Sequence, residues 1–442
     1  MSLFPNLYMN TSSKITIEQI LKARDMRAEK QRQFICEYGL PLISFTLNIA
    51  GEIKNSPLIE FLFMCGVEKI REFPFEIKYE EVHSEETGPV AYFVFNGDAG
   101  IIKNKAVELE ESEETFRLFD IDVIDKDFKK LSRESTRKCL ICDNMAQVCA
   151  RSRAHGLDTI KEKTQELLIS FASKKLAYYA QCALYDEVHT TPKAGLVDEN
   201  NSGSHTDMDI AAFEKSIAVL GSYFEKIALV SMREHEKEPQ TLMKHLREIG
   251  IEAENAMLEV TNGVNTHKGL IYSLGLLIAD IGGILMGLPT RLSLLASVGM
   301  KDAFDKAKNS PETHGEMQYS RCGAKGIRGE AQGGFKTAKE ASKILSEYKK
   351  TLDKNTAQAL TLVEIMKVLE DTNVLHRGGM EALSFMRMSA EKIASADIDK
   401  RLSVIKKLDD EFIKRNISPG GCADTLALAI FLDLFTQKHY YL

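Results

Sequence analysis

The sequence predicts a multidomain protein, with an α/β (α+β) domain over residues 1–157 and an all-α helical domain over residues 158–442. Three observations support this fold class. The chain of 442 residues is longer than one ordinary hydrophobic core accommodates. Short runs rich in apolar and β-branched residues occur in the first 125 residues, and helical periodicity dominates after residue 159. A change of composition near residues 151–159 marks the boundary between the domains.

The first domain alternates helical and strand-like segments. Charged and apolar residues at helical spacing predict an amphipathic helix over residues 17–37. Strands are predicted over residues 42–49, 90–95, 106–109 and 117–124, with short helical stretches between them. This mixture is typical of an α/β domain.

The second domain contains helix after helix and no convincing strand. Thr159 and Glu162 form a capping box ahead of a helical pattern of more than twenty residues. Further helices are predicted near residues 209–232, 240–260, 268–287, 291–307, 335–350, 355–370, 378–394, 397–414 and 423–437. Residues 269–289 approach the length of a membrane-spanning helix. They hold one charge, Asp280, but their glycines and the polar Tyr272 and Ser273 favour a buried central helix instead, and we expect no membrane partner.

The composition limits the compartment and the partners. A net charge of −7 argues against nonspecific binding to nucleic acid, which requires a basic surface. The first residues, Met-Ser-Leu-Phe-Pro-Asn, lack a basic region followed by an apolar one, so we expect no secretion signal. Eight cysteines scattered along a long chain then indicate free thiols in a reducing cytoplasm.

A pair of carboxylates on the last predicted strand is the candidate site of the first domain. Alternation along this strand puts Asp120 and Asp122 on one face. Two carboxylates placed in this way can bind Mg²⁺ together with substrate phosphates, as nucleotidyl transfer requires, so the domain is predicted to be nucleotidyltransferase-like. Arg117 on the same side and Lys54 after the Gly51 turn are candidate phosphate-binding residues. The alternative is an acidic strand that faces solvent.

A group of cysteines precedes the second domain. Cys139 and Cys142 have the spacing of a zinc-binding pair, and Cys149 and His155 follow them. The gaps to Cys149 and His155 are not those of a standard zinc finger. Small buried thiols are therefore the preferred interpretation, and structural zinc at Cys139, Cys142 and Cys149 is the less favoured one.

Polar and glycine-rich loops of the second domain are the candidate ligand-binding segments. In the clearest of them, Asn265, His267 and Lys268 lie directly ahead of a long apolar run. Flexible glycines there let the backbone approach a phosphate, which the N–H groups at a helix start also attract. The alternative is an ordinary helix cap beside a buried core histidine. Similar loops at residues 189–209, 313–335, 371–379 and 418–424 complete the evidence for a nucleotide-sized polyanionic ligand.

These motifs resemble two enzyme families. The similarity to the triphosphoribosyl-dephospho-coenzyme A synthases, which prepare the prosthetic group of citrate lyase, rests on residues 191–209, 261–273, 326–335, 377–379 and 418–427. The similarity to the holo-citrate lyase synthases, which attach that group to the acyl carrier subunit, rests on residues 42–54, 87–89, 117–124 and 137–155. The chain therefore resembles the fused two-enzyme form. It departs from the families at four positions. Proline is expected in place of Ala50 and Ala194, and glycine is expected in place of Phe116 and Asn262.

The resemblance implies two reactions in series. In the second domain, the ribose 2′-hydroxyl of 3′-dephospho-CoA attacks C1 of the ribose of ATP, and adenine leaves. In the first domain, a serine of the citrate lyase acyl carrier protein (gamma subunit) attacks the α-phosphate of the triphosphoribosyl product, and pyrophosphate leaves. ATP and 3′-dephospho-CoA are the implied substrates, and Mg²⁺ is the implied cofactor.

The resemblance also suggests roles for residues of the second domain. The candidate catalytic residues are Asp207, Asp209, Glu254, His267 and Glu330, of which Asp207 and Asp209 are also candidate metal ligands. The candidate substrate-binding residues are Lys193, Asn265, Lys268, Arg328, Arg377, Ser418, Gly420 and Gly421. Two alternatives stay open at this point: the equivalent enzyme of malonate decarboxylase, which uses the same prosthetic group, and a nucleotide-binding regulatory protein without turnover.

Overall fold

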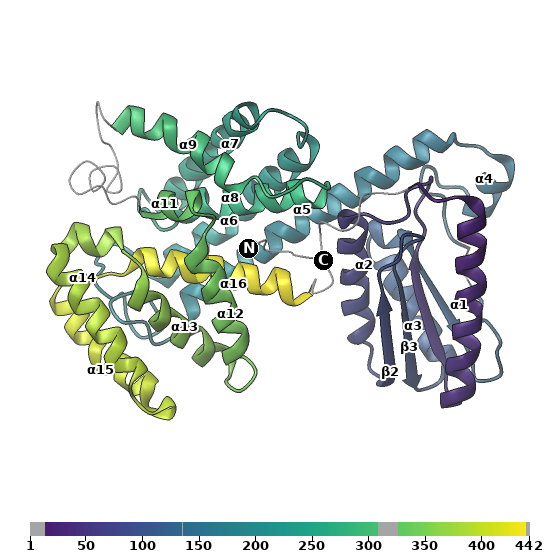
Figure 1. The fold of residues 1–442 in the computed structure, drawn as a ribbon, viewed down its shortest axis with the longest axis horizontal. Helices are drawn as coiled ribbons and strands as arrows, with labels where there is room; N and C mark the ends of the chain where they lie inside the picture. Colours follow the sequence, from purple (N-terminus) through teal and green to yellow (C-terminus); the bar gives the residue numbers. More distant parts are fainter. Residues whose placement is uncertain (1–13, 135, 308–325, 439–442) are drawn as a thin grey trace. The chain divides into compact units, whose positions relative to one another are not determined.

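The computed structural model describes residues 14–134, 136–307 and 326–438 (Figure 1). The motif residues Thr313, His314, Gly315 and Gly323 lie outside these ranges. Contacts divide the described chain into two compact units. Unit 1 comprises the described residues up to Ala172 together with Ile284–Pro289, and unit 2 comprises Ser173–Gly283 and the described residues of Thr290–Gln437. The predicted mixed α/β first part and helical second part are confirmed.

Unit 1 contains an antiparallel four-stranded sheet with the strand order β2-β3-β1-β4. The strands are β1 (Leu42–Leu47), β2 (Glu76–His83), β3 (Val90–Asn96) and β4 (Phe119–Ile124). β1, β3 and β4 lie where strands were predicted. The predicted strand over residues 106–109 is wrong, because these residues belong to α3 (Ala99–Ser112), whose buried Ile102, Ala106 and Leu109 recur at helical spacing. The edge strand β2 was missed because its many charged residues mask the alternation.

Helices cover both faces of this sheet. α1 (Ile17–Tyr38) packs Phe34 and Ile35 against Leu42 and Tyr92 on one face. α2 (Pro57–Arg71) packs on the other face, where Phe63 stacks on Phe45 with ring centroids 4.8 Å apart. Burial of these large side chains is the main stabilising contribution of the unit. The strands are consequently held in a fixed register, which positions the residues of β4.

Unit 2 is built from helices, which are labelled in Figure 1. They are α6 (Ile210–Arg233), α7 (Pro239–Val260), α8 (Lys268–Leu285), α9 (Leu292–Ala307), α11 (Gly326–Gln332), α12 (Lys336–Tyr348), α13 (Lys354–Val368), α14 (Thr372–Ala394), α15 (Arg401–Lys414) and α16 (Gly420–Lys438), preceded by α5 (Leu157–His189). The predicted helices of this part are all present. Two details were wrong. α5 begins at Leu157, so Thr159 lies inside the helix and does not cap it, and α14 begins before residue 378 and bends at Gly379.

The apolar segment forms the central helix α8. It is long and apolar enough to cross a membrane, but 83% of it is buried inside the protein, which confirms the predicted core helix. The carboxylate of Asp280 accepts hydrogen bonds from Thr290 Oγ1 at 2.7 Å and from Arg291 N at 2.6 Å. The one carboxylate of this apolar helix therefore binds the start of the next helix, as a buried polar group must be hydrogen-bonded.

Candidate functional site

A cavity of about 1200 Å³ in unit 2 is the principal candidate site. Its walls come from α7, the start of α8, α11, the loop after α5, the start of α14 and the start of α16. The predicted ligand-binding loops are therefore brought together around one space, as far as the structure describes them. Ligand pockets of single small molecules usually measure roughly 300–1000 Å³. This cavity has room for more than one such ligand.

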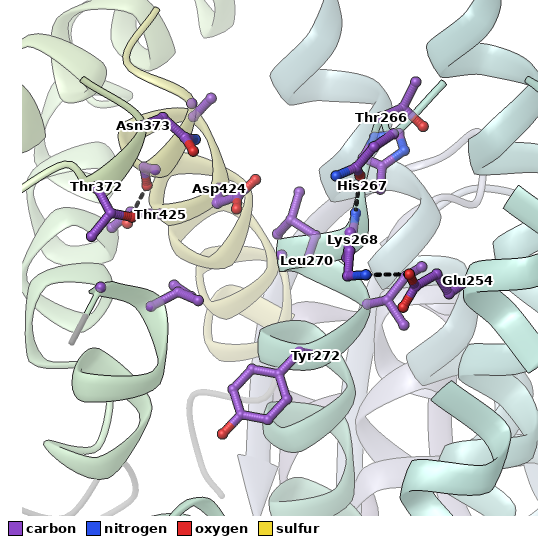
Figure 2. Close-up of a pocket in the computed structure, with 18 of the residues that line it drawn as sticks. Glu254, Thr266, His267, Lys268, Leu270, Tyr272, Thr372, Asn373, Asp424 and Thr425 are labelled. Carbon is purple, nitrogen blue, oxygen red and sulfur yellow. Dashed lines mark hydrogen bonds and ion pairs between the residues drawn. The ribbon is translucent and has the colours of Figure 1, made fainter. Parts of the chain in front are cut away.

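The start of α8 supplies one wall (Figure 2). Lys268 pairs with Glu254 of α7, and both side chains line the cavity. Asn265 Oδ1 accepts a hydrogen bond from Lys268 N at 3.1 Å, so Asn265 caps the first turn of the helix. The positive end of the helix dipole and the Lys268 ammonium consequently lie at the same wall, where they attract anions.

His267 lies between α8 and α6 with its ring almost completely buried. Its Nδ1 atom is 2.7 Å from Ser216 Oγ, and the ring meets Phe213 edge to face. Burial lowers the pKa of His267 to about 3, with a smaller contribution from the charge of Lys193. The imidazole is therefore neutral at pH 7, and it can act there as a hydrogen-bonding group rather than as an imidazolium acid.

Three buried polar atoms at the cavity have no hydrogen-bond partner among the described residues. They are Thr266 Oγ1, His267 Nε2 and Tyr272 Oη. A buried polar atom without a partner costs roughly 1–3 kcal/mol. These atoms are therefore available to the polar atoms of a bound ligand or to water.

We predict that His267 stays neutral from pH 8 down to about pH 5. In the unfolded chain this ring binds a proton below about pH 6.5, whereas the folded protein resists protonation until about pH 3. Protonation of His267 therefore favours the unfolded chain, and the free energy of unfolding decreases progressively as the pH falls from about 6.5 towards 3. NMR of ¹⁵N-histidine-labelled protein, with the signal assigned by His267→Asn, measures the titration. A ring that titrates near pH 6.5 would contradict the buried, neutral assignment.

The loop after α5 supplies a second wall. Lys193 is almost completely buried, and its Nζ atom donates to the carbonyl oxygen of Glu187 at 2.6 Å and to Glu187 Oε1 at 2.7 Å. The Lys193 N–H donates to Asp198 Oδ2 at 2.8 Å. Lys193 lines the cavity, but most of its hydrogen-bonding capacity holds the loop together.

Two glycines let this loop stack on its neighbours. Gly195 has φ +74°, and a Cβ atom there would lie 2.3 Å from the carbonyl oxygen of Ile417. Gly203 has φ +55°, and its Cβ would lie 2.6 Å from the carbonyl of Gly195. Backbone therefore packs directly on backbone, which glycine alone permits without strain. The Gly195 N–H also donates to Asp409 Oδ1 at 2.8 Å, which fixes the loop to α15.

Ser418, His205 and Arg377 form a hydrogen-bonded chain at the cavity. Arg377 Nη2 donates to His205 Nδ1 at 3.3 Å, because a guanidinium has only donors. The remaining proton of neutral His205 then lies on Nε2, which donates to Ser418 Oγ at 2.7 Å. Burial and the charge of Arg377 lower the pKa of His205, which favours this neutral form. The Ser418 hydroxyl retains its own proton for another acceptor.

Two carboxylates lie at the starts of the last helices. Asp371 accepts hydrogen bonds from Asn373 N at 2.8 Å and from Cys422 N at 2.9 Å, so it joins the starts of α14 and α16. Asp424 of α16 lies against α8, where a Cβ atom at Gly269 would come within 2.3 Å of Asp424 Oδ2. Burial and the nearby carboxylates of Glu187 and Asp371 raise the pKa of Asp424 well above its usual range. Figure 2 shows Asp424 and Glu254 on either side of the start of α8.

The remaining predicted residues of unit 2 differ in whether they line the cavity and in which groups they bind. Asp207 lines the cavity, with Oδ1 3.9 Å from His205 Nδ1. Asp209 is not among the residues that line it; its carboxylate caps α6 by accepting from Ala212 N at 2.9 Å. Glu330 lines the cavity but is held by Thr337 N at 3.2 Å and Thr337 Oγ1 at 3.1 Å. Other lining residues predicted from the sequence are Arg328, Gly420 and Gly421.

The lining residues that were missed as candidates include Asp424, Glu187 and Tyr272. Glu187 is the buried partner of Lys193, and its position in the last turn of α5 before a polar loop was the available signal. Tyr272 was taken for a polar interruption of an apolar helix. The Arg328 guanidinium lies over its ring, 6.0 Å from the centroid, in the range of a cation–π contact. Tyr272 therefore helps to place a cation at the cavity.

The predicted carboxylate pair of unit 1 lies on β4 as expected. Asp120 and Asp122 are opposite Thr46 and Ser44 of β1, and directly opposed residues share a face of the sheet. Lys130 Nζ lies 2.5 Å from Asp122 Oδ2. Burial and the charge of Asp122 raise the pKa of Asp120. Four oxygen-bearing side chains are therefore gathered on one face of two adjacent strands.

The two predicted cations of unit 1 have other partners. Arg117 belongs to the short helix η2 (Thr115–Leu118) rather than to β4, so strand alternation does not place it beside the carboxylates. Its guanidinium donates to the carbonyl oxygen of Cys139. Lys54 Nζ donates to the carbonyl oxygen of Ile49 at 2.5 Å, and burial lowers the pKa of Lys54. Both side chains support the loops around the sheet.

Comparisons with known proteins agree with this two-part arrangement. A family model of apo-citrate lyase phosphoribosyl-dephospho-CoA transferase matches residues 15–171, and a family model of ATP:dephospho-CoA triphosphoribosyl transferase matches residues 173–441. Protein CitXG of Haemophilus influenzae is 34% identical over 98% of this chain and 99% of its own length. Protein CitXG of Leuconostoc mesenteroides subsp. cremoris is 30% identical over 96% of this chain and 98% of its own length.

The chain belongs to the family of fused CitXG transferases. It is a bifunctional transferase, and its two activities make and attach the prosthetic group of citrate lyase, which confirms the resemblance drawn from the motifs. The 2-(5″-triphosphoribosyl)-3′-dephosphocoenzyme-A synthase of Klebsiella pneumoniae is 38% identical over 57% of this chain and 88% of its own length. The large cavity lies in the triphosphoribosyl transferase region, and the carboxylate pair lies in the phosphoribosyl-dephospho-CoA transferase region.

Proposed function

We propose that unit 2 makes 2′-(5″-triphosphoribosyl)-3′-dephospho-CoA from ATP and 3′-dephospho-CoA, with release of adenine, in the cavity at the start of α8. The observation that carries this assignment is the cavity itself, which has room for more than one ligand and combines cations with carboxylates. Unit 1 then transfers the phosphoribosyl-dephospho-CoA group to a serine of the citrate lyase acyl carrier protein, with release of pyrophosphate. Both steps take place in the cytoplasm.

The phosphates of ATP bind where cations and helix starts meet. Lys268 lies at the start of α8, and Gly420 and Gly421 begin α16. Arg328 and Arg377 add further cations along the cavity walls. A triphosphate needs several such donors at once, because each charge-assisted hydrogen bond contributes only about 1.5–3 kcal/mol.

The carboxylates serve the glycosyl transfer. The bond from C1 of the ribose to adenine breaks as the 2′-hydroxyl of 3′-dephospho-CoA attacks, so positive charge develops on the ribose and a proton must leave the hydroxyl. Asp424, whose pKa burial and the nearby carboxylates raise, is the candidate proton donor to the departing adenine. Glu254, which Lys268 holds in place, stabilises the developing positive charge or accepts the hydroxyl proton. Asp207 is the alternative proton acceptor at this site.

Mg²⁺ fits the chemistry of the donors in unit 1. Asp120 and Asp122 offer hard carboxylate oxygens, and Ser44 and Thr46 lie opposite them. Mg²⁺ held by the two carboxylates would neutralise phosphate charge during the transfer. Lys130 beside Asp122 adds a cation for the pyrophosphate leaving group. In unit 2, Asp207 is the remaining candidate ligand, because Asp209 caps α6.

One experiment tests both steps. The chain is incubated with ATP, 3′-dephospho-CoA and Mg²⁺, and adenine is measured by chromatography. Apo-citrate lyase carrier protein is then added, and its intact mass is expected to rise by one phosphoribosyl-dephospho-CoA group. The apo-carrier of malonate decarboxylase, in a parallel reaction, is expected to stay unmodified. Folded protein that releases no adenine would overturn the assignment of unit 2.

A further inference from the structure

A third site is formed by three cysteines and a histidine in unit 1. Cys139, Cys142, Cys149 and His155 come from one short segment, yet their ligand atoms all lie within 4.8 Å of one another. Cys139 and Cys149 are buried, and Cys142 and His155 are partly buried. Among the described residues, these four form the group of three or more histidine, cysteine or acidic side chains that lie close enough together to hold a metal ion.

The backbone of this segment is shaped to bring the four ligands together. A tight turn carries Cys139 and Cys142, and it is closed by the hydrogen bond from Cys139 N to the carbonyl oxygen of Asn144 at 2.8 Å. α4 (Ala146–Ser152) then presents Cys149. Arg153 follows in the left-handed conformation, with φ 48°, and reverses the chain so that His155 faces the cysteines. Ile141 N donates to Cys139 Sγ at 3.5 Å, which supports a thiolate at that position.

The distances fit a tetrahedral zinc ion. Zinc–sulfur bonds of about 2.3 Å and zinc–nitrogen bonds of about 2.0–2.1 Å separate two sulfurs by about 3.8 Å, and a sulfur from a nitrogen by about 3.6 Å. Cys142 Sγ lies 3.6 Å from Cys149 Sγ and 3.4 Å from His155 Nε2. A disulfide requires about 2.05 Å between the sulfurs. The spacing is therefore that of a shared metal ion rather than that of a bonded cysteine pair.

We propose that Cys139, Cys142, Cys149 and His155 bind one Zn²⁺ ion with a structural role. A set of three cysteines and one histidine fills all four positions of tetrahedral zinc and leaves none open for a substrate, as structural zinc sites do. The site replaces the free, buried thiols preferred from the sequence. The sequence pointed to these residues but favoured free thiols, because irregular spacing does not show that the turn and the reversal at Arg153 bring the four ligands together.

The metal positions the segment against the catalytic strand of unit 1. Arg117 donates to the carbonyl oxygen of Cys139. Arg137 donates to the carbonyl oxygen of Phe119 at 2.9 Å and pairs with the buried Glu110 at 2.8 Å. Phe119 begins β4, the strand that carries Asp120 and Asp122. Loss of zinc should therefore loosen the support of this strand and lower carrier modification, while adenine release in unit 2 continues.

Metal analysis of the full chain, purified without chelator, tests the proposal. By mass spectrometry of the metal, we expect about one zinc per chain in the wild-type protein. Cys142→Ser and His155→Ala should each hold less than about a tenth of that amount. Cys182→Ser, which changes a partly buried cysteine outside the cluster, should keep the wild-type zinc content. His155→Cys should retain zinc, since four cysteines also form a structural zinc site. This variant separates loss of a ligand from general misfolding.

Several results would overturn the zinc assignment. Unchanged zinc content in Cys142→Ser and His155→Ala would place the metal elsewhere. Absence of zinc from wild-type protein supplied with Zn²⁺ under reducing conditions would mean that the thiols are free. A chain mass two hydrogens lower, restored by reductant, would show a disulfide between cysteines of the cluster instead. Each readout is independent of catalysis, so it stands whether or not the proposed reactions are observed.

Discussion

Asp120→Asn combined with Asp122→Asn is expected to abolish modification of the carrier protein while adenine release continues at the wild-type rate. The double change removes both carboxylate charges from one face of β4, where they lie opposite Ser44 and Thr46. Loss of metal-assisted charge stabilisation amounts to several kcal/mol, and about 4 kcal/mol corresponds to roughly a thousandfold in rate. Intact-mass measurement of the carrier, with the triphosphoribosyl product supplied directly, measures this step alone.

Asp127→Asn is a suitable control for this pair. Its side chain is 74% exposed in the turn after β4 and pairs only loosely with Lys126, at 3.5 Å. It removes a carboxylate from the same region and should leave both activities unchanged. Loss of adenine release together with carrier modification in the double variant would refute the division of the two reactions between the units.

Lys268→Ala is expected to give the second large effect, a drop in kcat/KM for ATP. Lys268 lies at the start of α8 and lines the cavity with Glu254. Removing a charge-assisted phosphate contact costs on the order of 2–4 kcal/mol, which is roughly a 30- to 1000-fold loss. Steady-state adenine release at varied ATP concentration measures the change, and carrier modification from supplied product should be unaffected.

Lys226→Ala provides a matched comparison. Lys226 forms an exposed pair with Glu252 at 3.4 Å, on helices neighbouring the cavity, and it does not line the cavity. A surface pair of this kind contributes little, so the variant should keep wild-type kinetics. Equal kinetic losses in the two lysine variants would show that the effect of Lys268 is general electrostatics rather than contact with ATP.

Periodicity predicted most of the fold because most elements bury one face. Apolar residues recur at helical spacing in α6 and α7, and alternate in β4, so these elements were placed within a few residues. β2 is the edge strand of the described sheet, where it pairs with β3, and it carries many charged residues, so its sequence holds little of the strand signal. Residues 106–109 contain too few positions to distinguish a strand from the helix α3.

The site was predicted less completely, since residue type alone does not tell where a side chain points. Asp207 and Asp209 stand two positions apart, but one lines the cavity and the other caps α6. Glu187 and Asp424 are far apart in the sequence, and they interact because α5 and α16 bring them close together. Glycines and charged residues in loops identified the segments that line the cavity. The groups that each charged side chain binds could not be predicted, because they depend on packing between helices that are far apart in the sequence.

The backbone stack of Gly195, Gly203 and Ile417 determines how this enzyme could be adapted to another nucleotide. The carbonyl of Ile417 occupies the space that a Cβ atom at Gly195 would need, and the carbonyl of Gly195 occupies the space that a Cβ atom at Gly203 would need. No side chain can therefore be introduced at either glycine to reshape the loop. Changes of substrate preference would have to come from residues such as Tyr272 and Met243, whose side chains line the cavity. A mutant library directed at those two positions should yield altered selectivity far more often than one directed at the loop.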